Sequence, residues 1–206
     1  VPAVKMLKSF GVDRFYTLLK KLGISTLHRS ADGYGLTLIL GGAEGTLWDI
    51  SSVYLGMAHS LNHFFSEEKS NLNLYKKPHY LLNSPSDNNL SFPFGPGANY
   101  LTFQAMLEVV RPGAEAAWQS FSSSKKIAWK TGTSYGYRDA WAVGITPDYV
   151  VGVWAGNADG EGRAGLTGAT SAAPIMFDLF GLLKDGPWFD SPESRLIEIK
   201  TCAKSG

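Results

Sequence analysis

Three β-prone segments in the second half of the sequence constrain the fold more than any other feature. They read IAWKTGT (127–133), AWAVGIT (140–146) and YVVGVWAG (149–156), and they are rich in the β-branched and aromatic residues that favour strands. The last two are joined by the tight turn Thr146-Pro147-Asp148, which is typical of neighbouring antiparallel strands. The sequence therefore predicts an antiparallel meander.

Helical periodicity precedes these strands. Two short helices are predicted at the start of the chain: VPAVKMLKSF, which ends at Gly11, and DRFYTLLKKL, which is capped by Asp13 and ends at Gly23. A longer helix is predicted after the glycine-rich stretch LGGAEG. It begins at the capping-box-like pair Thr46 and Asp49.

Two further helices flank the predicted strands in the sequence. One lies in YLTFQAMLEVV (100–110), after a stretch (65–97) whose Ser, Asn, Pro and Lys content indicates a long surface excursion with short strands. The other lies in SAAPIMFDLFGLL (171–183), has Pro174 in its first turn, and is predicted to face inward with Ile175, Met176, Leu179, Phe180 and Leu183. Helices, then an antiparallel sheet and a covering helix, predict an α+β fold.

The charge balance and cysteine content exclude several classes of partner. The 206 residues hold 19 basic and 18 acidic side chains, so neither nucleic acid nor an anionic membrane is predicted as a primary partner. The single cysteine, Cys202, excludes an internal disulfide framework. The chain starts inside a helical pattern and stops without a closing element, so we expect it to be a piece of a longer protein.

The first predicted strand contains Lys130-Thr131-Gly132-Thr133, a composition that a strand interior disfavours. A functional explanation is an exposed strand edge on which an extended peptide adds as a further strand, with Gly132 at the point of approach. Thr131 and Thr133 would then offer hydroxyls to a carboxylate, and Lys130 a positive charge near developing negative charge. The structural alternative places Lys130 in water at a strand end and makes Gly132 a bulge.

Other serine patterns match catalytic motifs by their letters. Ser122 to Lys125 and Ser123 to Lys126 fit S-x-x-K, but they lie in a serine-rich turn directly before the first strand, and a polar loop is the favoured interpretation. Ser86-Asp87-Asn88 and Ser60-Leu61-Asn62 fit S-x-N. The first lies in a turn-forming stretch and the second at a helix end, and both are interpreted as structural.

Two sets of side chains suggest ligand sites less strongly. His59 and His63 have a spacing that can hold a metal, but they lack an obvious third ligand, so no metal is predicted. Trp141, Trp154 and Phe180 are interpreted as core residues rather than a stacking platform. Arg138 and Asp139 are expected to form a local pair or turn contact at the strand exit.

The stretch KTGTSYGYRDAWAVGITPDYVVGVWAGN resembles the active-site strand and following hairpin of class A bifunctional penicillin-binding proteins. YRDAW and the late TCAKSG are similar to the one-C subtype, and VPAVKML, LTLILGGAEGTLWDISSVYLGMAHSL and LTGATSAAPIMFDLF resemble further segments of the family. The resemblance covers most of the chain and is weakest over 65–97. It implies that residues 1–206 are the C-terminal part of a transpeptidase domain, with about 190–206 leading toward a further C-terminal domain.

The resemblance also implies a site and a reaction. It assigns catalytic roles to Lys130 and Thr133, and substrate binding to Thr131, Gly132, Thr133 and Ser134, with no cofactor. The partners it implies are peptidoglycan stem peptides, β-lactams and the missing N-terminal part of the same protein, which would carry the serine nucleophile and the S-x-N motif. The implied location is the periplasmic side of the inner membrane, although this chain shows no anchor.

Two other functions remain open on the sequence. A non-catalytic scaffold module would keep the peptide-binding strand without the chemistry. A serine β-lactamase shares the K-T-G strand, but its deacylation needs a water-activating glutamate, which the sequence does not identify.

Overall fold

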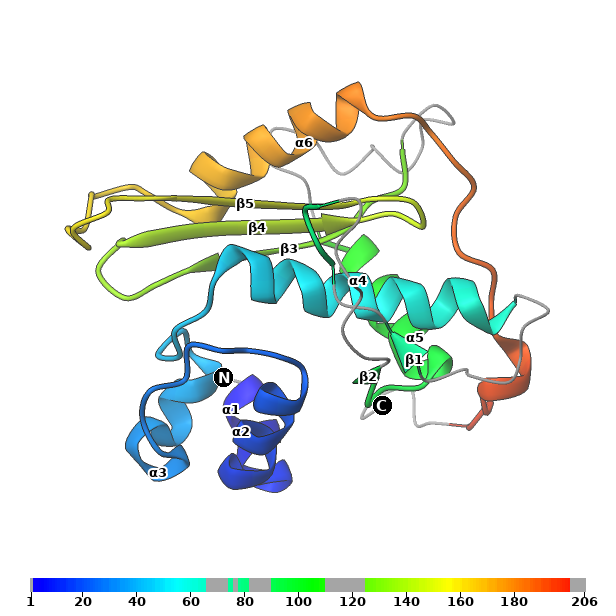
Figure 1. Cartoon of the computed structure of the whole chain (residues 1–206), viewed down its shortest axis with the longest axis horizontal. Coiled ribbons are helices and arrows are strands. Elements are labelled where there is room, and N and C mark those ends of the chain that lie inside the picture. The colour runs from blue at the N-terminus through cyan, green and yellow to red at the C-terminus, as the bar shows by residue number, and fades with distance from the viewer. Residues whose placement is uncertain (1, 66–73, 76–77, 82–89, 110–124, 201–206) are drawn as a thin grey trace.

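The computed structural model describes residues 2–65, 74–75, 78–81, 90–109 and 125–200. These residues form helices around an antiparallel sheet (Figure 1). The α+β prediction is confirmed.

The sheet is the predicted meander. Its strands are β3 (Ala128–Thr133), β4 (Asp139–Ile145) and β5 (Val150–Gly156), paired antiparallel in the order β3-β4-β5. The register places Lys130 opposite Val143 and Gly132 opposite Trp141. Alternate residues point to opposite faces, so the register decides which side chains share a face.

Helices cover both faces of this sheet (Figure 1). On one face, α6 (Ala173–Leu182) packs Met176 and Phe180 against Ile127 and Trp129. This packing is close, because a Cβ atom at Gly144 would lie 2.6 Å from the Phe180 ring. On the other face, α4 (Leu47–Phe64) and α5 (Pro96–Leu107) enclose a second core that includes Ala128 and Ile145.

The first forty residues form a helical unit with its own core. Helices α1 (Pro2–Phe10) and α2 (Val12–Lys21) make the predicted hairpin, followed by α3 (Ala31–Tyr34) and a 3-10 helix (Gly35–Ile39). Leu7, Leu27, Tyr34 and Leu38 are buried at its centre. The prediction that Asp13 caps α2 is wrong: the helix begins one residue earlier, at Val12, so Asp13 lies inside its first turn.

The middle helices agree with the sequence except at the two ends of α5, which runs over Pro96–Leu107 instead of 100–110. α4 begins as predicted, because the Thr46 hydroxyl accepts a hydrogen bond from the Asp49 N–H at 2.9 Å. α5 begins four residues before the predicted segment, since Pro96 supplies a preformed first helical position. Between them, β1 (Leu74–Tyr75) and β2 (Leu90–Ser91) form an antiparallel pair, and most of the predicted surface excursion lies outside the described residues.

The predicted inward face of α6 was too wide. Met176 and Phe180 are buried, but Ile175 and Leu179 are 48% and 42% exposed. A single stripe of side chains fills the contact with the strands, and Ile175 and Leu179 lie on the neighbouring stripe. Among the described residues, no helix combines the length and apolar character needed to cross a bilayer.

Candidate functional site

Strand β3 has one edge that no described strand covers. It pairs with β4 alone, and the pairing runs without interruption from Ala128 to Thr133. Lys130 is therefore inside the strand, and Gly132 is an ordinary strand position rather than a bulge. The structural alternative is wrong about the strand end and the bulge, although Lys130 is exposed as it predicts.

Gly132 is exposed, and nothing in the described chain requires it to be glycine. A Cβ atom there would lie 3.5 Å from the Trp141 Cβ, an ordinary contact distance. Glycine weakens a strand interior, so this position costs stability without a packing reason inside the described part of the protein.

A cavity of about 800 Å³ opens beside β3, over the sheet face that Lys130 and Gly132 share with Val143 and Trp141. One wall is the glycine-rich segment 41–45, and the other is β3 from Lys130 onward. Ile50 and Tyr54 of α4 line it together with Trp141 and Val143 of β4. All five residues that the sequence assigned to the site, Lys130, Thr131, Gly132, Thr133 and Ser134, line this cavity.

Lys130 is exposed and shares a sheet face with Gly132, the face covered further along by α4. Its ammonium donates a hydrogen bond to the Thr131 carbonyl at 2.6 Å. The charge is therefore held along the strand edge, beside the cavity.

Thr131 and Thr133 belong by the same alternation to the opposite face of the strand. The Thr133 hydroxyl accepts a hydrogen bond from the Gly168 N–H at 3.0 Å. A hydroxyl both donates and accepts, so this contact orients the Thr133 side chain and leaves its own proton able to reach an anion.

Gly168 is a structural part of the site that the sequence analysis missed. It begins a π-helical turn (Gly168–Ala172), where a Cβ atom would lie 2.4 Å from the Trp141 carbonyl oxygen and 2.6 Å from that of Gly132. Only glycine allows this approach. The glycine itself was visible in LTGATS, but its contact with a strand 35 residues away was not.

Ser134 closes the hairpin that follows β3. Its N–H donates to the Asp139 carbonyl at 3.0 Å, and its hydroxyl accepts from the Asp139 N–H at 2.9 Å. The turn between them needs left-handed backbone at Gly136 (φ 75°) and Tyr137 (φ 56°). These bonds define a structural role, and substrate binding by Ser134 stays a prediction.

The glycine-rich wall is anchored by a cluster that the sequence analysis did not identify. The Glu44 carboxylate accepts hydrogen bonds from the Tyr34 hydroxyl and from Arg29, the latter at 2.8 Å. The Tyr34 hydrogen bond, then Arg29, lowers the pKa of Glu44 to about 2. No motif marks these residues, because they meet only through the fold of the N-terminal helical unit.

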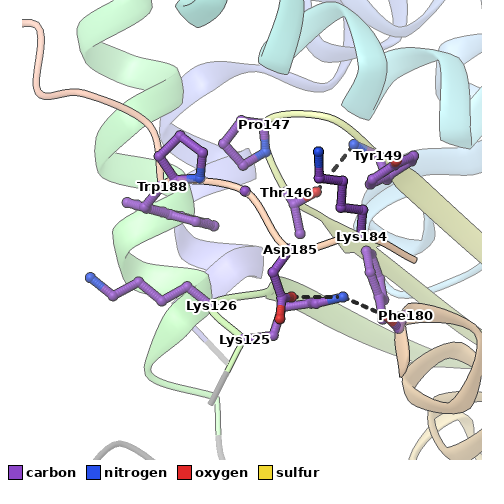
Figure 2. Close-up of a pocket in the computed structure, with 11 residues that line it drawn as sticks. Lys125, Lys126, Thr146, Pro147, Tyr149, Phe180, Lys184, Asp185 and Trp188 are labelled. Carbon is purple, nitrogen blue, oxygen red and sulfur yellow. Dashed lines mark hydrogen bonds and ion pairs between the residues drawn. The ribbon is translucent and has the colours of Figure 1, made fainter. Parts of the chain in front are cut away.

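The S-x-x-K interpretation of Lys125 is not supported by its contacts. Its ammonium donates to the Phe180 carbonyl at 2.6 Å and pairs with Asp185 at 2.9 Å (Figure 2). It also donates to the Leu183 carbonyl at 2.7 Å. It therefore caps the C-terminal end of α6, where cations are favourable. Ser122 and Ser123 lie outside the described residues.

The S-x-N match at the end of α4 is structural. Ser60 is buried and donates to the Phe94 carbonyl, while the Asn62 amide donates to the Pro147 carbonyl at 2.8 Å. Both contacts are structural. Ser86-Asp87-Asn88 lies outside the described residues.

The aromatic and histidine sets differ in part from their interpretation. Phe180 is core, but Trp154 is 38% exposed, and its indole N–H donates to Asp139 at 2.9 Å, so Asp139 contacts Trp154 rather than Arg138. The rings of His59 and His63 stack 5.5 Å apart. Within the ranges that the structure describes, no group of three or more His, Cys, Asp or Glu side chains could hold a metal.

Comparison with known proteins gives relatives of one kind. The chain is 33% identical to penicillin-binding protein 1C of Escherichia coli K12 over 184 residues, and this match covers 89% of the chain. It is 27% identical to penicillin-binding protein 1A of Neisseria cinerea over 186 residues, and this match covers 85% of the chain. The crystal structure of penicillin-binding protein 1A from Haemophilus influenzae matches 92% of the chain with a TM-score of 0.63 at 16% identity. No family model matches.

The match is to part of each relative. This chain spans 22% of the length of the two relatives and 34% of the crystallised chain. Over most of its length the chain is therefore homologous to penicillin-binding proteins, and it has the fold of the corresponding part of penicillin-binding protein 1A.

Proposed function

We propose that this chain is the C-terminal part of the transpeptidase domain of a class A penicillin-binding protein of the one-C subtype, with about 190–206 leading toward a further domain. In this proposal β3 binds the D-Ala-D-Ala end of a peptidoglycan stem peptide as an added strand. The observation that carries it is Gly132, which is exposed on the edge strand and lines a large cavity. No packing among the described residues requires a glycine at this position. The homology to penicillin-binding proteins supports it.

The proposed reaction is acyl transfer through a serine ester. A serine hydroxyl gives its proton to a neighbouring base and attacks the penultimate D-Ala carbonyl; the peptide C–N bond breaks, and the terminal D-Ala leaves with a proton on its amine. An amine of a neighbouring stem then attacks the ester and releases the serine. We place this serine and the S-x-N motif before Val1 in the complete protein, so the chain needs that part for activity.

The strand residues have separate roles in this reaction. Lys130 supports proton transfer and offsets negative charge, since its ammonium lies at the cavity edge. Thr131 and Thr133 hold the terminal carboxylate, and the Thr133 hydroxyl, already accepting from Gly168, has its proton to donate. The Thr133 N–H is one of two oxyanion donors; losing one such donor costs about 3 kcal/mol of transition-state stabilisation.

A β-lactam would occupy the same cavity as the terminal dipeptide and acylate the same serine. The chemistry needs no cofactor. The corresponding location is the cell envelope, on the periplasmic side of the inner membrane, where stem peptides and β-lactams are both accessible.

The decisive experiment is labelling of the complete protein with a fluorescent penicillin. Gly132→Val should abolish labelling, because its side chain occupies the approach to the strand edge, while the protein stays folded. Gly181→Val is the matched control, since a Cβ at Gly181 meets nothing within 4 Å and the position lies on α6, away from the cavity. Normal labelling of the Gly132→Val protein would refute the proposal.

The same experiment separates the other two functions. A folded complete protein that is never labelled would indicate a non-catalytic peptide-binding module. Rapid turnover of the penicillin, in place of a stable acyl-enzyme, would indicate a β-lactamase.

A further inference from the structure

The charged side chains around the β3 cavity do not balance one another. The cavity is lined by three cations and two carboxylates, namely Arg29, Lys130, Arg138, Glu44 and Asp139. Glu44 is already paired with Arg29 at 2.8 Å, and Asp139 accepts from the Trp154 indole at 2.9 Å. Lys130 and Arg138 therefore remain without an acidic partner among the described residues.

Arg138 stands on a hairpin whose backbone is fixed on both sides. Ser134 and Asp139 close it with two hydrogen bonds, and the Arg163 N–H donates to the Tyr137 carbonyl at 3.1 Å from outside. A Cβ at Gly162 would lie 2.0 Å from the Gly136 carbonyl oxygen, so the two backbones are in direct contact. The base of the Arg138 side chain is thus held at a defined place on the cavity rim.

The Arg138 side chain lies near two glycines, at ordinary contact distances from the Cβ positions of both. A Cβ at Gly136 would lie 3.9 Å from the Arg138 Nε, and one at Gly162 would lie 3.7 Å from its Cγ. The guanidinium has no hydrogen bond or ion pair to any described residue. Arg138 is therefore a cation on a fixed backbone, and its five N–H donors are available to a planar anion.

The placing of Thr133 and Arg138 in one cavity favours a peptide with two carboxylates. Thr133 and Arg138 line the same cavity, with the hairpin turn that follows β3 between them. If the reacting carbonyl lies at Thr133, an extended peptide continues past the end of β3 toward the hairpin that carries Arg138. We infer that Arg138 forms a second anion subsite, for a carboxylate on a side chain of the donor peptide.

This subsite rests on the proposed function and narrows its substrate class. The terminal carboxylate is held by Thr131, Thr133 and Lys130, and Arg138 selects donor peptides that carry a second acidic group over those whose side chain ends in an amide. Arg138 is a specificity-determining residue in this scheme, and it takes no part in the bond changes.

Two penicillins that differ by one carboxylate test the inference. Benzylpenicillin carries the ring carboxylate alone, and α-carboxybenzylpenicillin carries one more on its side chain. In the complete protein, Arg138→Gln should lower the acylation rate constant for the dicarboxylate by roughly fivefold, the effect of one exposed ion pair. Acylation by benzylpenicillin should change less than about twofold, which also shows that the variant is folded.

Arg163→Gln is the matched control, because it removes one positive charge beside the same hairpin, and Arg163 does not line the cavity. It should leave the ratio of the two rate constants unchanged. Arg138→Lys should recover part of the ratio, since it restores the charge but not the planar donor pair. In the unmodified protein the ratio should fall as salt is raised from low to high concentration.

The outcomes separate the two levels of the proposal. Acylation by both penicillins with a ratio that Arg138→Gln does not change would overturn the subsite and leave the proposed function standing. A complete protein that neither penicillin acylates would overturn both.

Discussion

The N–H of Gly168 donates to the Thr133 hydroxyl across 3.0 Å, so the turn before α6 is tied to the exposed strand of the candidate site. Gly168 is buried, whereas Thr133 is exposed at the cavity. The residue predicted to meet the substrate carboxylate is thereby held from behind by the protein backbone. The Thr133 hydroxyl is therefore expected both to bind the substrate and to stabilise the fold.

The first prediction separates those two roles at Thr133. Thr133→Val should lower the free energy of unfolding by about 1–3 kcal/mol, because it leaves the buried Gly168 N–H without an acceptor. Thr133→Ser keeps the oxygen and should cost less than about 1 kcal/mol. Urea denaturation of the three proteins measures the difference; equal stability of the Val and Ser variants would contradict the hydrogen bond.

The second prediction compares two glycines that meet at β3. Gly132→Ala should change the free energy of unfolding by less than about 1 kcal/mol, since its Cβ has room. Gly168→Ala should cost about 1–3 kcal/mol, because its Cβ collides with two carbonyl oxygens. Thermal unfolding measures both, and a Gly168→Ala protein as stable as the unmodified one would show that the approach is looser than described.

The third prediction concerns the pH dependence of the wall formed by Glu44. The folded pKa of about 2 lies below the ordinary value of 4.5, so the carboxylate contributes stability above pH 4.5 that is lost as the pH falls toward 2. Its side chain is 42% exposed and therefore screened, so the contribution should not exceed about 1 kcal/mol.

Glu44→Gln provides the measurement. The stability difference between the unmodified protein and this variant should be constant above pH 5 and should shrink between pH 4.5 and 2. Tyr34→Phe should reduce that pH dependence, because the Tyr34 hydrogen bond is the largest cause of the lowered pKa. A difference that stays constant down to pH 2 would mean that Glu44 titrates normally.

The fourth prediction tests the structural role of Lys125. Lys125→Met should cost about 1–3 kcal/mol, because the last carbonyls of α6 lose a charged donor that is only 18% exposed. Lys126→Met, one residue later and exposed, should change stability by less than about 0.5 kcal/mol. Chemical denaturation measures the free energy of unfolding of both variants. Similar decreases in that free energy would contradict the capping role of Lys125.

The sheet could be predicted because its information is local. The β-branched and aromatic residues and the turn at Pro147 predicted the bounds of the three strands to within one residue. The helical unit around α3 could not be predicted in the same way. It depends on Tyr34 and Arg29 meeting Glu44, 10 and 15 residues away, and no periodicity in the sequence encodes that meeting.

Of the two walls of the site, only the β3 wall could be predicted from the sequence. The composition of Lys130 to Thr133 marked the strand, because lysine and glycine are out of place there. The opposite wall, with Arg29, Glu44 and the glycines 41–45, is defined by tertiary contacts. The unbalanced charge of Arg138 became visible only once the partner of Asp139 proved to be Trp154.

The two sides of the cavity are built on different cores. The glycine-rich side belongs to the apolar cluster around Leu7 and Tyr34, whereas β3 belongs to the clusters beneath α4 and α6. The two sides are nevertheless joined, because Leu22 packs against the cluster beneath α4 and Ser25 donates its N–H and hydroxyl hydrogen bonds to Asp49 of α4. These contacts fix the spacing between the glycine-rich wall and the sheet, so the width of the opening is set by the fold itself.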